Sequence, residues 1–382
     1  MTRVTGAGLI LAATVLASAC STTVDGQASG PASLTAPSSS SPVPAGLDVG
    51  EYPTTLYQVP QGEITAAWTA EGNRMLATLI EPMDIDPTLV ATPKAREPYP
   101  VTTLAASTTL PSYVGYLTRD AKVGVALVRA DKAEAPTTEV SVAAVRMAEV
   151  ADGPQALATA RTVSRSSAVI PGLTDGVVHE EAPGEINILF VRGPLLMNIN
   201  VKAPTAARAV ELAADLYRRQ TVETSRFTPT ATQAITAVPL DREGVLARAL
   251  HLGMEVTELE QRRIGLLTLP VFERRGGNPK QTAMLREAGV DLVGWNNSIV
   301  LRTRDSAAAL RLFDQLREAS KRTQVEGVIG LSVPVQCSRG DSGEDNTCTL
   351  AVGRFVAQVQ ASDLTAVRQA AAAQWTILTR NP

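Results

Sequence analysis

The sequence predicts an α+β fold built from two related domains, each an antiparallel sheet with helices on one face. Three observations support this fold class. Alternating apolar and polar residues form hairpin-like pairs of strands, capped segments with helical periodicity stand between and after them, and the order strand, helix, hairpin, helix occurs twice. A unit of this order is of the split β-α-β kind.

The first copy contains a strand over 139–150, a helix capped by Asp152, a hairpin of 185–191 and 195–202 joined at Arg192-Gly193, and a helix capped by Thr205. Before it, the sequence predicts a helix over 64–80 that Pro82 and Pro87 end. The apolar side of the first helix has Trp68, Met75, Leu76, Leu79 and Ile80, and the last helix has the stripe Ala207, Val210, Ala214 and Tyr217. Both patterns have the helical spacing of a core-facing stripe.

The second copy repeats this order with different residues. It consists of a strand over 291–302, a helix capped by Asp305, a hairpin between 328 and 359, and a helix opened by Asp363 with the stripe Leu364, Val367, Ala371, Trp375 and Leu378. Before it, the sequence predicts a helix over 241–252 with an Asp cap. The step from Thr205 to Tyr217 equals the step from Asp363 to Trp375, twelve residues by subtraction of the numbers. We interpret this as a duplication. Two unrelated α+β domains with equal spacing are the alternative.

Length and composition fit this organisation. A chain of 382 residues is longer than most single domains. We expect a first domain over 46–230 and a second over 231–382, with the boundary between 222 and 240, where the stretch TPTATQAITAVP lacks a helical period. The apolar content is 45% with aromatics at 4%, so the core is expected to be aliphatic. The 35 basic and 38 acidic residues are interspersed, which argues against a nucleic-acid partner.

The first residues are typical of an export signal. Arg3 supplies the positive charge, and the apolar run 7–17 is too short to span a bilayer. Small residues directly before Cys20 resemble a bacterial lipobox, although Ala17 stands where that motif most often has leucine. An ordinary secretory cleavage would cut at the same place. We expect residues 1–19 to be a lipoprotein signal peptide and Cys20 to carry the lipid anchor.

The residues after Cys20 are predicted to be a tether. Residues 20–45 are rich in Ser, Pro and Ala and contain almost no large apolar residue, so they cannot bury enough surface to offset the entropy of ordering. The alternative is a partly ordered arm. This composition predicts a disordered spacer between the membrane and a folded body that begins near residue 46.

The three cysteines are an odd number for an exported protein. Lipidation of Cys20 leaves Cys337 and Cys348, which bracket the short stretch CSRGDSGEDNTC. We expect these two to form a disulfide, worth roughly 2–3 kcal/mol in the chain-entropy description. A metal site with Asp341, Glu344 and Asp345 is the alternative, but two thiols without histidine make a poor zinc site.

The sequence contains no complete catalytic or cofactor motif. Residues Gly340 to Gly343 match the nucleophile loop of trypsin-like proteases for four positions, yet Glu344 replaces the next glycine. The chain's two histidines, His179 and His251, stand in sequence contexts unlike that family's. The stretch 273–282 lacks the GK[ST] of a P-loop and is expected to be a turn. We therefore assign no catalytic, metal-binding or cofactor-binding residue.

Several short motifs carry a resemblance to a known family. They are Leu47-Asp48-Val49-Gly50, Tyr52-Pro53-Thr54-Thr55, Asn73-Arg74-Met75, Asp86-Pro87, Cys348, Gly353-Arg354-Phe355 and Ala371-Ala372-Ala373-Gln374-Trp375. With these motifs the chain resembles a family of actinobacterial, chiefly mycobacterial and nocardial, exported lipoproteins of uncharacterised function. The resemblance implies a two-part globular body outside the membrane and transfers no catalytic residues.

These observations together lead to one expected function and two alternatives. We expect a lipid-anchored protein on the outer face of the cell membrane that binds or scaffolds an envelope lipid, glycan or protein without catalysis. The first alternative is an envelope hydrolase that uses a cleft carboxylate or His179. The second is an extracytoplasmic sensing module with a signalling partner. No cofactor is expected, and the oligomeric state is left open.

Overall fold

The structure is a computed structural model that describes residues 46–93, 98–102, 120–166, 168–252, 258–276, 279–331, 333–340 and 345–382. The predicted signal peptide, the tether and Cys20 lie outside the described residues. Within the described residues, none of the helices combines the length and the apolar character that crossing a membrane requires. The chain divides into two compact units: a larger one with residues 57–277 and 291–301, and a smaller one with the chain up to residue 56, 278–290 and 302–382.

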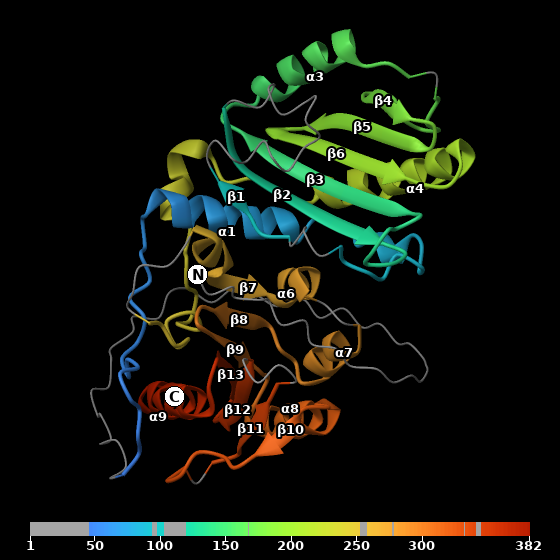
Figure 1. Ribbon diagram of the computed structural model, residues 1–382. Helices are drawn as coiled ribbons and strands as arrows, with labels where there is room; N and C mark the ends of the chain where they lie inside the picture. Colours follow the sequence, from blue (N-terminus) through green and yellow to red (C-terminus); the bar gives the residue numbers. More distant parts are fainter. Residues whose placement is uncertain are drawn as a thin grey trace. The chain divides into compact units, whose positions relative to one another are not determined.

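The first sheet has six antiparallel strands in the order β1-β2-β3-β6-β5-β4 and belongs to the larger unit (Figure 1). Its strands are β1 (Val101–Thr102), β2 (Ala121–Ala130), β3 (Glu139–Met147), β4 (Val177–Ala182), β5 (Glu185–Arg192) and β6 (Leu195–Lys202). The α-helices of this unit are α1 (Ile64–Leu76), α3 (Asp152–Val163), α4 (Ala206–Ser225), α5 (Glu258–Arg263) and α6 (Leu269–Gly276), with 3-10 turns η1 (Pro82–Asp84) and η4 (Thr232–Ala237).

The second sheet has seven antiparallel strands in the order β10-β11-β12-β13-β9-β8-β7. Its strands are β7 (Gly265–Thr268), β8 (Leu292–Trp295), β9 (Ser298–Arg302), β10 (Thr323–Val325), β11 (Val335–Arg339), β12 (Asn346–Val352) and β13 (Phe355–Ala361). The smaller unit has the helices α7 (Pro279–Glu287), α8 (Ser306–Ala319) and α9 (Leu364–Arg380).

The two sheets repeat one strand order. The order β2-β3-β6-β5-β4 in the first sheet corresponds to β8-β9-β13-β12-β11 in the second, and each series is followed by a long helix, α4 or α9. The predicted α+β fold with two antiparallel sheets is therefore confirmed. The caps of the corresponding helices agree as well, since the side chains of Thr205 and Asp363 accept the backbone N–H of Arg208 and Ala366.

Helices cover both faces of each sheet rather than one. In the larger unit α3 packs through Ala156, Leu157 and Ala160 on Val145, Leu189 and Leu196. Strand residues alternate between faces, so their neighbours Phe190 and Met197 point the other way, where Phe190 meets Tyr217 of α4 with ring centroids 5.1 Å apart. In the smaller unit α8 and α9 likewise lie on opposite faces (Figure 1). Both faces of these strands can be apolar, which allows a helix on each.

The region predicted as a helix over 241–252 is instead a series of turns, so this prediction is wrong. Glu243 and Gly244 have φ values of 63° and 70°, which a right-handed helix does not accept. The Asp241 carboxylate accepts the N–H groups of Leu246 and Ala247 at 2.9 and 2.8 Å, five and six residues along. The side chain thus closes a wide loop instead of capping a helix.

Three further predictions need correction. Residues 291–302 form the two strands β8 and β9 rather than one, because the chain turns at Asn296-Asn297. The predicted hairpin between 328 and 359 is the three-stranded series β11-β12-β13. The buried stripe of α4 is shifted: it contains Ala209, Leu212, Ala213, Leu216 and Tyr217, whereas Ala207 is exposed and Val210 is half-buried.

Candidate functional site

The smaller unit contains two adjoining hollows on the α8 side of its sheet. One is a small pocket of about 60 Å³ and the other an open hollow of about 460 Å³, and both are lined by Phe313, Arg317 and Gln336. We call them together the polar groove. Its lining residues are Leu310, Phe313, Asp314, Leu316, Arg317, Ser320, Arg322, Gln324, Val333, Pro334, Val335, Gln336, Ser338, Thr347, Thr349, Gln358 and Gln360.

Strand alternation explains why the floor of the groove is polar. Gln336, Thr349 and Gln358 are directly opposite one another on β11, β12 and β13 and form one cross-strand row. The next row along the strands is Ser338, Thr347 and Gln360. Residues at every second position of a strand share a face, so all six side chains point to the α8 side.

A disulfide lies behind this floor. Cys337 and Cys348 are directly opposite each other on β11 and β12, with Cα atoms 4.0 Å apart, and are joined by a disulfide bond. Both residues are fully buried. Cys337 and Cys348 each stand between two groove residues on their strands, so their side chains point to the opposite face, toward α9. The bond therefore links β11 to β12 on the face away from the groove. The floor is therefore held by a covalent link as well as by the sheet hydrogen bonds.

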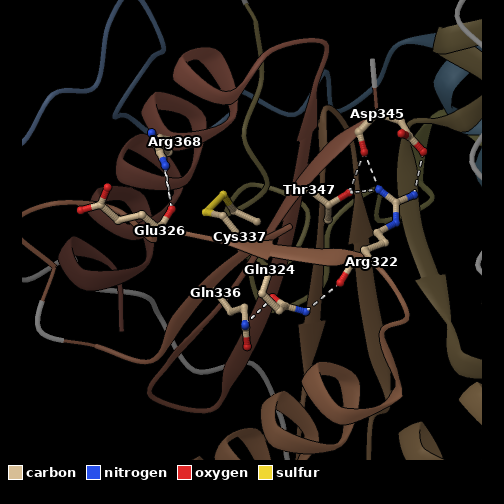
Figure 2. The surroundings of a disulfide bond; sticks show 9 residues. Arg322, Gln324, Glu326, Gln336, Cys337, Asp345, Thr347 and Arg368 are labelled. Atoms are coloured by element: carbon tan, nitrogen blue, oxygen red, sulfur yellow. Dashed lines mark hydrogen bonds and ion pairs between the residues drawn. A yellow bond between two sulfur atoms is a disulfide. The ribbon is translucent and has the colours of Figure 1, made fainter. Parts of the chain in front are cut away.

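An ion pair closes one end of the floor. The Arg322 guanidinium donates from Nη2 to Asp345 Oδ2 at 2.8 Å and from Nη1 to Thr347 Oγ1 at 3.2 Å, and also reaches the Asp345 carbonyl (Figure 2). Figure 2 also shows the amides of Gln336 and Gln324 pointing toward one another, with Gln336 donating to Gln324 Oε1. The arginine charge is thus compensated inside the protein.

Three floor residues keep unused hydrogen-bonding capacity. In the part of the chain that the structure describes, the side chains of Ser338, Thr349 and Gln358 make no hydrogen bond. Gln360 only reaches Thr347 Oγ1 from Nε2 at 3.5 Å. Hydroxyls and primary amides both donate and accept, so this surface can pair with a ligand that does the same.

The groove offers little for proton transfer or nucleophilic attack. The residues that line the small pocket include hydroxyls, amides and two arginines, and none of these lining residues is a carboxylate, imidazole or thiol. Asp314 lines the open hollow, where Arg317 Nη2 lies 3.2 Å from its Oδ1. This lining suits recognition through hydrogen bonds rather than general acid–base catalysis.

Both histidines of the sequence belong to the larger unit, and neither lines the groove. His179 on β4 accepts the Arg165 backbone N–H at Nδ1 with a distance of 3.2 Å, and its Nε2 is 3.5 Å from Glu181 Oε2. The ring of His251 is 5.5 Å from that of Tyr57, centroid to centroid. Among the described residues no three His, Cys, Asp or Glu side chains gather as a metal site would require.

Sequence-predicted site residues fare differently. The structure contains the Cys337–Cys348 disulfide that we predict. Cys20 lies outside the described residues, and so does 341–344, which holds most of the protease-like string. The groove itself was not predicted. The signal was present as polar residues at every second position of three successive strands, at 336 and 338, 347 and 349, and 358 and 360.

The corresponding face of the larger unit is apolar at Leu189 and Leu196, where α3 packs, and polar at Asn187, Asn198 and Asn200. Asn187 on β5 and Asn200 on β6 are directly opposite, and the Asn200 amide donates to Asn187 Oδ1 at 2.9 Å. Asn198 donates to the Ile188 carbonyl at 3.2 Å. Asn187 and Asn198 are buried. Their amides are hydrogen-bonded, whereas the side-chain amide of Gln358 in the smaller unit makes no hydrogen bond among the described residues. The Asn198 and Asn200 amides thus bond within the sheet of the larger unit, whereas Gln358 in the smaller unit keeps its amide available.

The comparisons with known proteins concern family membership. No curated protein and no solved structure gave a match. A family model described as domain of unknown function DUF7373, N-terminal, matches residues 60–240, and one described as DUF7373, C-terminal, matches residues 246–381. Together they cover well over half of the chain, with one match for each of the two repeated halves. The chain therefore belongs to the DUF7373 family.

Proposed function

We propose that this protein is a non-enzymatic binding module of the cell envelope, held on the outer face of the membrane by a lipid on Cys20, and that the polar groove is its binding site. The observation that carries the proposal is the groove floor. Ser338, Thr349 and Gln358 present unused donors and acceptors there. A floor with free hydrogen-bonding groups and no proton-transfer group binds without reacting.

The rigidity of the floor supports this role. The rows belong to paired strands that the Cys337–Cys348 bond fastens together, so the side chains start from a preformed scaffold. Ordering a binding site costs free energy at the moment of binding, and a preformed site avoids most of that cost. The groove therefore needs few contacts to achieve useful affinity.

The tethered location rests on the sequence. The proposal includes the finer identity as an actinobacterial exported lipoprotein, because small residues precede Cys20 and a Ser/Pro/Ala-rich stretch follows it. A flexible spacer of the length of 21–45 has a root-mean-square span of about 25–30 Å. Such a spacer allows the folded units to search the envelope near the membrane surface.

The anchor is tested by membrane fractionation. Cys20→Ser should move the protein from the membrane fraction to the soluble exported fraction, because the acyl chains are lost. Globomycin, which inhibits lipoprotein signal cleavage, should make the unprocessed precursor accumulate. Unchanged fractionation of Cys20→Ser would contradict the anchored location without affecting the groove.

Groove function is tested by capture of envelope material. The full chain, purified in detergent and immobilised, is exposed to detergent extracts of the envelope, and retained lipids, glycans and proteins are measured by mass spectrometry. The variant Gln336→Met/Thr349→Val removes hydrogen-bonding groups from the groove, and Gln155→Met on the exposed side of α3 is the matched control. Wild type and control should retain the same material and the groove variant should not. Equal retention by all three proteins, or none above a denatured sample, contradicts the proposal.

A further inference from the structure

We propose that the ligand of the polar groove is a neutral saccharide, which binds through its hydroxyls to Gln336, Thr349 and Gln358 and packs a ring face against Phe313 and Leu316. This inference rests on the proposed binding role and adds the chemical class of the ligand. Four features of the groove support it: its charge, the type of its polar groups, its position on the sheet and its size.

The charges of the groove are already balanced. Arg322 is paired with Asp345 at 2.8 Å, and Arg317 with Asp314 at 3.2 Å. An anionic ligand would have to displace one of these carboxylates to gain an arginine, and a cationic ligand would meet a carboxylate that is already occupied. The remaining free groups are uncharged, which favours an uncharged ligand.

The free polar groups match hydroxyls. A sugar hydroxyl both donates and accepts, and so do the Thr349 hydroxyl and the Gln358 amide, the latter with two donors and two lone pairs. Directly opposite residues on neighbouring strands are roughly 5 Å apart, a separation comparable with the width of one sugar ring. The row formed by Gln336, Thr349 and Gln358 can therefore contact several hydroxyls of one or two adjacent rings.

The position on the sheet argues against an extended peptide. Peptides that add to a sheet use the free backbone groups of an edge strand. The backbone of β12 is already paired with β11 and β13 on its two sides, so the floor offers side chains rather than backbone groups. Recognition here depends on side-chain amides and hydroxyls, which a peptide backbone does not require.

The size and the apolar wall complete the fit. Phe313, which is 6% exposed, lines both hollows, and the half-buried Leu316 lines the small pocket, so a narrow apolar surface lies beside the polar rows. The C–H face of a sugar ring is the apolar surface that such a wall accepts. The open hollow of about 460 Å³ is in the usual range for small-molecule sites and has Gln336 in its lining. Thr349 and Gln358 line the adjoining pocket of about 60 Å³, which has room for a hydroxyl group of the sugar but not for a whole ring.

The test is an array of neutral oligosaccharides with several sugar types and linkages, probed with the purified full chain in lauryldimethylamine oxide, a detergent without a sugar headgroup. The Kd of each saccharide that binds on the array is then measured by titration calorimetry. Oligogalacturonate serves as the anionic comparison and penta-alanine as the peptide comparison. At least one neutral saccharide should bind with a Kd at or below the millimolar range, and both comparison compounds should bind at least tenfold more weakly.

Groove variants locate the binding. Gln358→Met and Thr349→Val keep side-chain bulk while removing hydrogen-bonding groups. Each should raise the Kd for the saccharide by about tenfold. Gln155→Met should leave its affinity unchanged within twofold. Thermal unfolding of each variant confirms that it is folded. If Gln358→Met unfolds, the Thr349→Val measurement carries the test.

Three results overturn the inference: no neutral saccharide binds, the bound saccharide is insensitive to both groove variants, or the anionic or peptide probe binds more tightly. If groove-dependent capture of envelope material persists in that case, the binding role stands and the saccharide class is wrong. If that capture fails as well, the binding role itself is wrong. The two experiments therefore separate the two proposals.

Discussion

Gly193 and Gly353 have the same backbone conformation, φ 55°, at the same place in two corresponding hairpins. Gly193 stands between β5 and β6, and Gly353 stands between β12 and β13. Each glycine is the first central residue of a two-residue turn between antiparallel strands, a position where turns favoured by the strand twist have φ > 0, which glycine adopts without steric cost. The shared conformation is therefore one physical constraint that both halves of the chain satisfy in the same way.

Alanine at either glycine should destabilise the protein by about 1–2 kcal/mol, because a side chain disfavours left-handed backbone. A Cβ at either position would meet nothing within 4 Å, so the loss comes from the backbone alone. Asparagine should cost less than alanine, since it tolerates this region better. Urea unfolding followed by circular dichroism measures both changes. Gly276→Ala, also in open space but without positive φ, is the control and should cause no such loss.

Loss of the disulfide should destabilise the smaller unit. Cys337→Ala/Cys348→Ala is expected to lower the free energy of unfolding by roughly 2–3 kcal/mol, because the unfolded chain regains the freedom that the short loop removes. Both sulfurs are buried, so in the oxidised protein no thiol at these positions should react with iodoacetamide before reduction. Alkylation followed by peptide mass spectrometry checks the second expectation. Two labelled cysteines in the unreduced protein would contradict the bond.

Acid should weaken the contact between Asp175 and α4. Burial alone would raise the pKa of Asp175, but hydrogen bonds from Tyr217 Oη and Arg192 Nη1, both at 2.6 Å, lower the pKa below its ordinary value of 3.8. A carboxyl whose pKa is lower in the folded state contributes stability above its unfolded pKa, and this contribution is lost as the pH falls through the folded pKa. Stability from this group should therefore disappear below about pH 4.

The comparison of wild type with Asp175→Asn measures this effect. Melting temperatures at pH 7 and pH 3 should differ more in the wild type than in Asp175→Asn, which has no carboxyl to titrate there. Tyr217→Phe should behave in an intermediate way, because it removes one of the two hydrogen bonds. The same pH dependence in wild type and Asp175→Asn would show that the contact contributes nothing.

The position of the buried stripe on α4 is open to direct test. Leu212 is 1% exposed, and Leu212→Ala should destabilise the protein by about 2–5 kcal/mol through the cavity that it leaves. Val222 on the same helix is 50% exposed, and Val222→Ala should change stability by no more than about 0.5 kcal/mol. Urea unfolding compares the two. Similar losses would contradict the assignment of the core-facing side.

Local signals predicted much of the fold correctly. Thr205, Asp305 and Asp363 each cap a helix as predicted, since their side-chain oxygens accept the N–H three residues on. The hairpin at Gly193 was also predictable, because alternation and a turn residue are both present within a few positions. The prediction of a helix over 241–252 was wrong because the interactions that shape this segment are not those of a local cap. Its Asp241 bonds to N–H groups five and six residues away, which no local capping rule describes.

The candidate site shows the same division. The disulfide was predictable because two cysteines remained after one was assigned to the anchor, and they flank a short stretch. The groove was not, because Gln336, Thr349 and Gln358 are contributed by three strands whose register was unknown. A shift of one residue in a strand would have turned its side chains to the α9 face.

By itself, the sequence determined the α+β class, the repeated order of elements, the helix caps at Thr205, Asp305 and Asp363, and the cysteine pair, since each depends on residues close together in the chain or on simple counting. The predicted cap at Asp152 is wrong, because Asp152 is the first residue of α3 and its carboxylate accepts the Glu149 backbone N–H. Only the tertiary structure decided which faces the helices cover, and that polar residues on neighbouring strands form one surface with free hydrogen-bonding groups. The physical reason is that register and helix side are chosen by long-range packing, which places Phe313 over Gln336 and Cys337 on the opposite face.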